Sequence, residues 1–409
     1  MGTIEQRWRH SLSRREALLS LAGMLAGSPL LHAQHDPHPL AGHKRVPGID
    51  EMLTAFDFEP VCFANLPRAS YDYMARGSES EFTLRRNREA FDWVDLVERP
   101  GASPDAIKLS TEVLGLKLES PFFVCPTARQ RDLHPDAESA MYQGATAGKA
   151  AMIVVGRSTI PIDKVALAAN GPRWSQFYPV QDLKLAREEL EKFQAAGAQA
   201  IVVTVDQQTD VGYERDSHNR NLGGVARAAV PAGRGGSPPP AGPAPTKGAA
   251  LYRVTPARLW YTWKYLDDIR PFIKVPMLLK GIMTAEDAKL CVERGFDGIM
   301  VSNHGARSMD YNPSTLEVLP EIVDAVGGKI PVIVDGGIRR GSDAVKAMAL
   351  GATAVGVGRA PRWGLGAFGP QGVQRLLEII QQEFRVAMAR TGRTSLAALD
   401  RTALKVNFK

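Results

Sequence analysis

Short apolar stretches rich in β-branched residues recur along most of the chain. Eight of them occupy residues 121–128, 151–156, 173–178, 200–206, 276–281, 298–303, 331–336 and 354–359. Near-continuous hydrophobicity over so few residues is typical of strands buried on both faces of a parallel sheet. Segments with helical character, such as residues 285–294 and 342–350, lie between most of these stretches. Eight strand–helix units predict an α/β fold of the (β/α)8 or TIM-barrel class, with an open doubly wound sheet as the alternative.

Two regions differ from the repeats in composition. Residues 34–48 are rich in His and Pro and are expected to be a linker, and from Ile49 the chain is expected to form an N-terminal helical segment. Between the fourth and fifth strands, residues 230–248 are dominated by Pro and Gly. A long segment of this kind in a compact barrel is usually either functional or disordered. Because it follows the carboxyl end of a strand, we interpret residues 211–255 as an active-site lid, with a plain disordered loop as the alternative.

The first residues have the organisation of an export signal. A basic stretch ends at Arg14 and Arg15, an apolar run covers residues 17–31, and the small residue Ala33 follows. The pattern resembles a twin-arginine signal, apart from Ala17, where Phe is usual. The predicted parts are a signal peptide at 1–33, a linker at 34–48 and a barrel domain at 49–409. This interpretation predicts a periplasmic or other extracytoplasmic location, and the alternative is an ordinary amphipathic helix or a signal that is never cut.

Composition excludes several classes of function. The net charge of +6 is small for 409 residues, and no basic stripe lies beyond the first fifteen of them. This argues against a nucleic-acid partner. The three cysteines, Cys62, Cys125 and Cys291, are too few and too scattered for a disulfide framework or a structural zinc site. We expect buried free thiols and no metal.

Polar residues stand at the carboxyl ends of most of the predicted strands. They are Thr127, Gln176, Tyr178, Thr204, Asp206, Lys280, Ser302, Asn303, His304 and Asp335. In a (β/α)8 barrel this end carries the active site. Because several buried strands each finish in a polar group, the pattern indicates a site rather than a structural accident.

The last two strands are followed by glycine-rich turns that contain arginines. Residues 335–341 include Arg339, and residues 356–359 end in Arg359. Glycines let backbone N–H groups approach an anion closely, and a guanidinium adds a charged fork. Barrels commonly hold phosphate after strands seven and eight, so we expect a phosphate site there.

His304 is the strongest candidate for a catalytic base. Arg307 lies three residues on and could bind a carboxylate in a bidentate manner. Asp206, at another strand end, could fix the imidazole tautomer and stabilise the imidazolium. A single structural histidine is the alternative.

The stretch SNHGARSMD at residues 302–310 resembles the signature of the FMN-dependent 2-hydroxy-acid dehydrogenases, the family of glycolate oxidase and lactate oxidase. The resemblance covers nearly everything from about residue 50 onward. It extends through YDY at 71–73 with Gly77, TLRRN at 83–87, PTA at 126–128, QFY at 176–178, TVD at 204–206, Lys280-Gly281, the 335–341 loop and Gly358-Arg359.

The resemblance implies a role for each matched residue. His304 would be the base, paired with Asp206, and Tyr178 would contact the substrate hydroxyl. Arg307 and Tyr73 would hold the substrate carboxylate. FMN would be bound by Pro126, Thr127, Ala128, Gln176, Thr204, Lys280, Ser302, Asp335, Gly336, Gly337, Arg339, Gly358 and Arg359. The reaction would convert a 2-hydroxy acid, of the L configuration, to the 2-oxo acid.

The substrate side departs from the family pattern at three positions. Arg157 falls where glycolate oxidase-like members carry an aromatic residue, Tyr213 where they carry a second active-site arginine, and Val155 where they carry a serine. We hypothesise that Arg157 replaces the missing cation and binds a distal anionic or polar group of a larger substrate. The alternative is that Arg157 points to solvent.

Two other functions compete with this interpretation. One is an FMN barrel of another reaction type, such as an isomerase, and the other is a non-catalytic, exported flavin-binding protein. The electron acceptor could be oxygen, a quinone or a cytochrome. The chain has no Cys-x-x-Cys-His haem motif, and Ala128 is compatible with an oxidase. Family members are commonly tetramers, so the resemblance implies a homo-oligomer.

Overall fold

The computed structural model describes residues 46–206 and 262–408. The predicted signal peptide, most of the linker, the predicted lid and Tyr213 lie outside the described residues. Within the described part, no helix has the length and hydrophobicity needed to span a bilayer. Cys62, Cys125 and Cys291 are buried free thiols, which confirms the prediction made for them.

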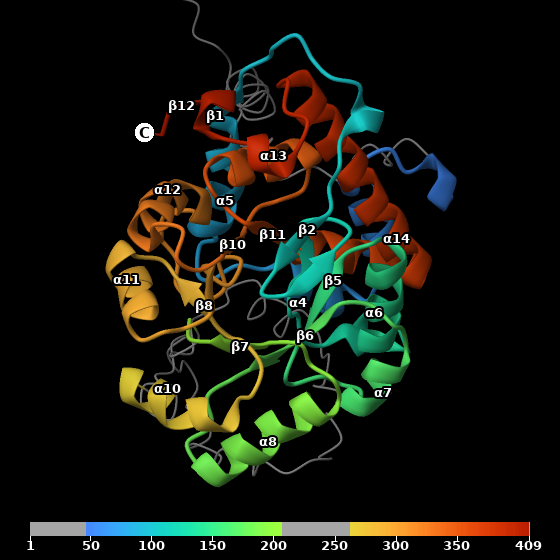
Figure 1. Cartoon of the computed structure of the whole chain (residues 1–409). Helices are drawn as coiled ribbons and strands as arrows, with labels where there is room; N and C mark the ends of the chain where they lie inside the picture. Colours follow the sequence, from blue (N-terminus) through green and yellow to red (C-terminus); the bar gives the residue numbers. More distant parts are fainter. Residues whose placement is uncertain (1–45, 207–261, 409) are drawn as a thin grey trace, which may run out of the picture. The chain divides into compact units, whose positions relative to one another are not determined.

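Eight parallel strands close into a barrel in the order β10-β11-β4-β5-β6-β7-β8-β9 (Figure 1). They are β4 (Phe122–Val124), β5 (Ala151–Val154), β6 (Arg173–Phe177), β7 (Ile201–Thr204), β8 (Met277–Ile282), β9 (Gly298–Val301), β10 (Val332–Asp335) and β11 (Ala354–Val357). The eight apolar stretches of the sequence supply one strand each. The predicted (β/α)8 barrel is therefore confirmed, and the open doubly wound sheet is wrong.

Helices surround the strands and cover their outer faces (Figure 1). They are α6 (Ala137–Ala147), α7 (Ile162–Leu167), α8 (Leu183–Ala195), α10 (Trp263–Ile269), α11 (Ala285–Glu293), α12 (Thr315–Val326), α13 (Gly341–Ala349) and α14 (Arg359–Arg390). Helix α12 begins with a reciprocal cap, since Ser314 and Glu317 each accept a hydrogen bond from the other's backbone N–H. Helix α14 is kinked at Phe368 and Gly369, just before Pro370.

An N-terminal helical segment precedes the barrel, as predicted. It contains the short 3-10 turns at Ile49–Glu51 and Ala55–Asp57, then α3 (Phe58–Asn65), α4 (Arg68–Ala75) and α5 (Phe82–Asp92). Asn65 of α3 donates to the carbonyls of Gly366 and Ala367, which fixes α3 against α14. Strand β1 (Val94–Leu96) then pairs antiparallel with β12 (Leu404–Val406). The strand that follows the N-terminal helices therefore lies beside the strand near the C-terminus.

A small hairpin covers the barrel interior at the end away from the predicted site. It consists of β2 (Thr111–Val113) and β3 (Leu116–Leu118). Val113 and Leu118 are buried in one apolar cluster with inward-facing strand residues. The rest of that cluster is Phe123, Cys125, Ala151, Ile153, Trp174, Ala200, Val202, Leu278, Met300, Ile333 and Ala354. The barrel is therefore a packed core at this end.

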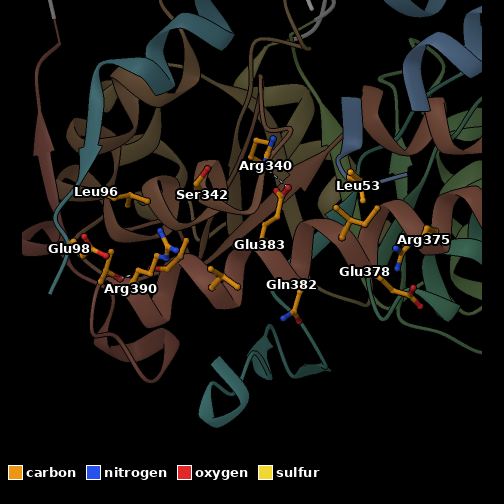
Figure 2. Close-up of a pocket in the computed structure, with 14 residues that line it drawn as sticks. Leu53, Leu96, Glu98, Arg340, Ser342, Arg375, Glu378, Gln382, Glu383 and Arg390 are labelled. Atoms are coloured by element: carbon orange, nitrogen blue, oxygen red, sulfur yellow. Dashed lines mark hydrogen bonds and ion pairs between the residues drawn. The ribbon is translucent and has the colours of Figure 1, made fainter. Parts of the chain in front are cut away.

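A surface groove of about 850 Å³ runs along the outer face of α14 (Figure 2). Its wall includes the ion pair between Arg340 and Glu383, whose nearest atoms are 2.9 Å apart. Glu383 also accepts from the backbone N–H of Gly341 at the start of α13. None of the predicted site residues lines this groove. These contacts hold α13 to α14 and do not belong to the site.

Candidate active site

The strands place an apolar layer and a polar layer inside the barrel. Side chains two residues apart on a strand point to the same face. On five strands, an apolar core residue is followed, two positions on, by a buried polar residue nearer the carboxyl end. The pairs are Trp174 and Gln176, Val202 and Thr204, Leu278 and Lys280, Met300 and Ser302, and Ile333 and Asp335. The polar members form the floor of the predicted site.

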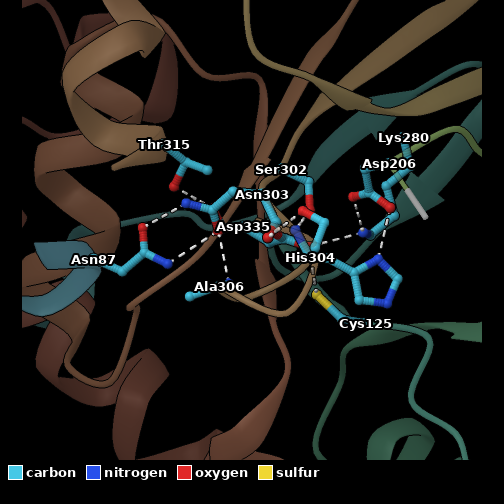
Figure 3. A network of polar contacts seen from close by, with 11 residues as sticks. Asn87, Cys125, Asp206, Lys280, Ser302, Asn303, His304, Ala306, Thr315 and Asp335 are labelled. Carbon is cyan, nitrogen blue, oxygen red and sulfur yellow. Dashed lines mark hydrogen bonds and ion pairs between the residues drawn. The ribbon is translucent and has the colours of Figure 1, made fainter. Parts of the chain in front are cut away.

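A chain of short polar contacts joins the strand ends (Figure 3). His304 Nδ1 lies 2.6 Å from Asp206 Oδ1, and Lys280 Nζ lies 3.3 Å from the other oxygen of Asp206. Lys280 Nζ is also 3.9 Å from Asp335 Oδ2, which accepts from the thiol of Cys125 at 3.6 Å. The side chain of His304 is 15% exposed, while those of Asp206 and Lys280 are 7% and 4% exposed. The predicted base, its aspartate and the lysine therefore form one buried unit.

The charges of this unit follow from burial and pairing. Burial raises the pKa of Asp206, but His304 and Lys280 outweigh it, so the pKa is lowered and the carboxylate is ionised. Burial lowers the pKa of His304, and the attraction of Asp206 only partly offsets that effect. The imidazole is therefore neutral near pH 7, as a base must be. With Nδ1 held by the carboxylate, the other ring nitrogen, Nε2, is the one that can accept a proton.

His304 stands on a loop of unusual backbone conformation. His304, Gly305 and Ala306 have φ values of +59°, +64° and +63°, although two of them carry a Cβ atom. Left-handed non-glycine residues persist only where their surroundings enforce them, and they concentrate at functional sites. Here the backbone N–H groups of His304 and Ala306 donate to the side chains of Ser302 and Asn303.

A pair of amides fixes that loop to α5. Asn303 and Asn87 each donate to the other's side-chain oxygen, at 2.9 and 3.0 Å. Both are buried. Ser78 also donates its backbone N–H to the carbonyl of Ala306. The N-terminal helical segment thus positions the histidine loop of the barrel.

Arg307 lies beside Tyr73, the other residue assigned by resemblance to the substrate carboxylate. Its Nη1 donates to the carbonyls of Tyr73 and Arg76 at 2.9 and 3.2 Å, and its guanidinium carbon is 4.9 Å from the centre of the Tyr73 ring. Burial raises the pKa of the Tyr73 hydroxyl, but four surrounding guanidiniums outweigh it and lower the pKa. They belong to Arg307, Arg362, Arg76 and Arg129. This end of the site is strongly cationic.

Tyr178 and Arg157 lie together at another edge of the site. Burial and the negative charge of Asp206 raise the pKa of Tyr178 to about 12, so its hydroxyl stays protonated. The guanidinium carbon of Arg157 is 5.4 Å from the centre of the Tyr178 ring. Arg157 is exposed, so it stacks on the outer side of Tyr178 and does not enter the core.

The glycine-rich turns after β10 and β11 bring two predicted arginines together. Arg359 is the first residue of α14, and burial lowers its pKa well below the usual range, with Arg307 and Arg339 adding repulsion. Burial and the nearby Arg88 lower the pKa of Arg339 to about 10. Gly337 has a φ of +78°, and a Cβ there would come within 1.9 Å of the carbonyl of Asn87. Buried like charges at a helix N-terminus favour an anion such as phosphate.

The polar residues at the strand ends include hydrogen-bonding atoms that have no partner in the protein and could bind a flavin. Among the described residues, four buried polar atoms of predicted FMN ligands have no partner: Gln176 Nε2, Thr204 Oγ1, Asp335 Oδ1 and Arg359 Nε. Buried polar groups are normally hydrogen-bonded, so these atoms indicate a polar ligand. Pro126, Thr127 and Ala128 follow β4 and are half-buried, and Gly336 and Gly358 lie in the two turns. The residues therefore fit a ring with polar edges that carries a phosphate.

Two residues of the site carry no role in the sequence-based prediction. They are Asn87, which lies in the TLRRN stretch, and Arg362. Arg362 could have been found, because it lies one helical turn after Arg359 on the same face of α14. Asn87 comes from a segment whose position beside the barrel depends on tertiary packing.

Comparison with known proteins identifies the family. The FMN-dependent dehydrogenase family matches residues 62–406. Glycolate oxidase 1 of Zea mays is 37% identical over 366 residues, which are 86% of this chain and 95% of the relative. A peroxisomal (S)-2-hydroxyacid oxidase of Arabidopsis thaliana is 35% identical over 351 residues, 84% of this chain and 94% of the relative.

The fold of a solved relative agrees with these sequence matches. The crystal structure of mandelate oxidase with (S)-2-phenylpropionate has a TM-score of 0.75 and 32% identity, covering 88% of this chain and all of the other. The chain therefore belongs to the FMN-dependent dehydrogenase family and is an FMN-dependent oxidoreductase.

Proposed function

We propose that the protein oxidises a 2-hydroxy acid, of the L configuration, to the corresponding 2-oxo acid. The observation that carries this proposal is the buried pair of His304 and Asp206, 2.6 Å apart. Arg307, a carboxylate-binding residue, stands three positions on in the same loop beside Tyr73. A base and a carboxylate site on one rigid loop suit a substrate whose hydroxyl and carboxylate are on adjacent carbons.

Each residue of the site has a task in this reaction. Arg307 and Tyr73 bind the substrate carboxylate, and the protonated hydroxyl of Tyr178 donates to the substrate hydroxyl. The neutral Nε2 of His304 accepts a proton from the substrate, and Asp206 stabilises the imidazolium that results. When bound, FMN supplies the acceptor for the two electrons lost with the two hydrogens.

Lys280 serves the cofactor side of the reaction. Burial lowers the pKa of Lys280, but Asp206 and Asp335 outweigh it, so the pKa is raised and the ammonium is permanent. A fixed buried cation stabilises negative charge that develops beside it. By resemblance, Gln176, Thr204, Ser302 and the residues 126–128 bind the flavin ring. Asp335, Gly337, Arg339, Gly358 and Arg359 bind the ribityl phosphate.

Arg157 is proposed to bind a distal anionic or polar group of a larger substrate. Its support is the stacking on Tyr178, which places a cation at the edge of the site, although its exposure to solvent weakens the interaction. The test compares Arg157→Ala with the wild type on a short aliphatic 2-hydroxy acid and on a larger acidic one. We expect a selective loss on the acidic substrate. Equal losses on both would count against the role.

Three further properties are proposed from sequence and resemblance. Electrons pass from the reduced flavin to oxygen, a quinone or a cytochrome, and the rate of reoxidation by each identifies the acceptor. The protein is a homo-oligomer, with a tetramer expected by light scattering. Export depends on the twin-arginine pair, so replacing Arg14 and Arg15 with Lys should retain the protein in the cytoplasm, as cell fractionation would measure.

An anaerobic titration with a panel of 2-hydroxy acids, followed by flavin absorbance, tests the main proposal. Bleaching by one class of acid identifies the cofactor, the reaction and the substrate together. A bound flavin that no 2-hydroxy acid reduces contradicts the proposal and favours an FMN barrel of another reaction type or a flavin-binding protein.

A further inference from the structure

Arg362 is a buried arginine with little to bind inside the protein. It lies on α14, three residues after Arg359, and is 5% exposed. Its Nη1 donates to the carbonyl of Ala128 at 3.0 Å. Its Nε and Nη2 are buried and have no hydrogen-bond partner in residues 46–206 and 262–408. The carboxylate of Asp132 is near enough to raise the pKa of Arg362. However, Asp132 forms its ion pair with Arg129, at 2.5 Å.

A buried guanidinium in this state is energetically costly for the fold. Desolvation of a charged group costs several kcal/mol unless a partner compensates it. Burial lowers the pKa of Arg362 to about 10, and the positive charge of Arg307 contributes in the same direction. A single hydrogen bond to Ala128 does not need a charged donor, since a neutral amide could make it. The hydrogen bond to Ala128 therefore does not account for the charge, and the pKa of Arg362 stays lowered despite the nearby Tyr73 and Asp132.

The position of Arg362 indicates where the missing anion binds. Its guanidinium carbon is 5.9 Å from the centre of the Tyr73 ring, and that of Arg307 is 4.9 Å from the same point. A carboxylate bound at Tyr73 is therefore within the field of both guanidiniums. In a buried site such charges interact strongly, because little solvent screens them.

We propose that Arg362 is a further specificity-determining residue, which acts with Arg307 to recognise the substrate carboxylate at Tyr73. This inference rests on the proposed function, since it assigns a carboxylate to this end of the site. Arg362 supplies the second positive charge of the site from α14, while Arg307 supplies the first from the histidine loop. The site then selects an ionised acid over its neutral amide or ester.

Arg129 provides a matched control on the same ring. Its guanidinium carbon is 4.2 Å from the centre of the Tyr73 ring, closer than that of Arg362. However, its side chain is 49% exposed, and Asp132 neutralises it. Solvent and the carboxylate screen its charge, so Arg129 should contribute little to anion binding.

The test measures ligand binding to the oxidised, FMN-loaded protein. Benzoate and benzamide, which have no hydroxyl to oxidise, are titrated against the flavin absorbance of four proteins: the wild type, Arg362→Gln, Arg362→Lys and Arg129→Gln. Gln keeps a donor for Ala128 but removes the charge, and Lys keeps the charge. Flavin content and melting temperature are recorded for each variant.

We expect Arg362→Gln to raise the Kd of benzoate about tenfold and to leave that of benzamide within about twofold. Arg362→Lys should recover most of the benzoate affinity, and Arg129→Gln should stay within about twofold of the wild type. With a 2-hydroxy acid that reduces the flavin, Arg362→Gln should raise the concentration of that acid needed for half the limiting rate. The limiting rate of flavin reduction itself should stay nearly unchanged. The alkaline loss of benzoate binding, caused by ionisation of Tyr73, should move to higher pH in this variant.

Several outcomes would overturn the assignment. They are unchanged benzoate binding in Arg362→Gln, equal losses for benzoate and benzamide, or no benzoate binding by the wild type. If Arg362→Gln does not retain flavin, a folded Arg362→Lys that has lost tenfold or more in benzoate affinity also contradicts it. A different result separates the two proposals. If the wild type binds benzoate but no 2-hydroxy acid reduces its flavin, Arg362 is still an anion ligand, and only the proposed function is contradicted.

Discussion

Replacement of Asp206 by Asn tests the catalytic unit most directly. The contact of 2.6 Å between Asp206 and His304 has the length of a charge-assisted hydrogen bond. When His304 accepts the substrate proton, it forms a buried ion pair with Asp206, and losing one charge of such a pair costs about 3–5 kcal/mol. Because Asn keeps an oxygen as acceptor, we take the lower value of about 3 kcal/mol. At about 1.4 kcal/mol per decade, the rate of flavin reduction should fall roughly 100-fold.

The pH dependence of Asp206→Asn gives an independent check on the cause. Asp206 raises the pKa of His304 against the effect of burial, so its loss should lower that pKa further. The acid limb of the plot of flavin-reduction rate against pH should then move to lower pH, while the maximal rate of flavin reduction falls. The assay is anaerobic stopped-flow reduction of the bound flavin by a saturating 2-hydroxy acid between pH 5 and 9.

Asp310→Asn is the matched control for this experiment. Asp310 is also buried, but it accepts from Ser80, Phe82 and Thr83 and does not contact His304 or Lys280. It should change stability more than the reduction rate or the acid limb. A fall of less than threefold in Asp206→Asn, with an unmoved acid limb, would refute the role given to the pair.

Three other measurements probe the site and its support. Because the pKa of His304 is lowered and its neutral form is the base, the acid limb of kcat/KM should reach half its maximum at a pH below the pKa of an ordinary histidine. Asn87→Ala removes both amide contacts to Asn303, so it should cost about 1–3 kcal/mol in denaturant unfolding and slow flavin reduction about tenfold. Arg86→Met removes the paired contacts to Glu317, at 2.7 and 2.8 Å, and should lower the free energy of unfolding by about 1 kcal/mol without changing the reduction rate.

The barrel was predictable because its strands are buried on both faces. Such strands appear in a sequence as short apolar stretches, and each of the eight was found. The hairpin of β2 and β3 was not predicted. Its strands have three residues each, and only Val113 and Leu118 are buried at their ends. A pattern so short does not differ from that of a loop, and its burial depends on the barrel beneath it.

The strand-end residues of the site were predictable for a related reason. The period of two along a strand places Lys280 after Leu278, and Ser302 after Met300, on the same inner face. The backbone of the histidine loop was not predictable, since a left-handed conformation is rare for alanine and remains uncommon even for histidine. That conformation depends on Asn87, which lies more than two hundred positions away in the chain. Only the folded N-terminal segment brings it there.

The charges of the site also bear on the order of cofactor binding and export. Arg339 is buried and Arg359 half-buried, and burial together with neighbouring cations lowers the pKa of each. An anion bound among them relieves that repulsion, and a ligand at a thousand times its Kd stabilises a folded protein by about 4 kcal/mol. We therefore expect binding of the FMN phosphate to stabilise the native state. A chain with this requirement is best loaded before it leaves the compartment that makes the cofactor. A twin-arginine route, which carries folded proteins, suits that order and is consistent with the export signal proposed for residues 1–33.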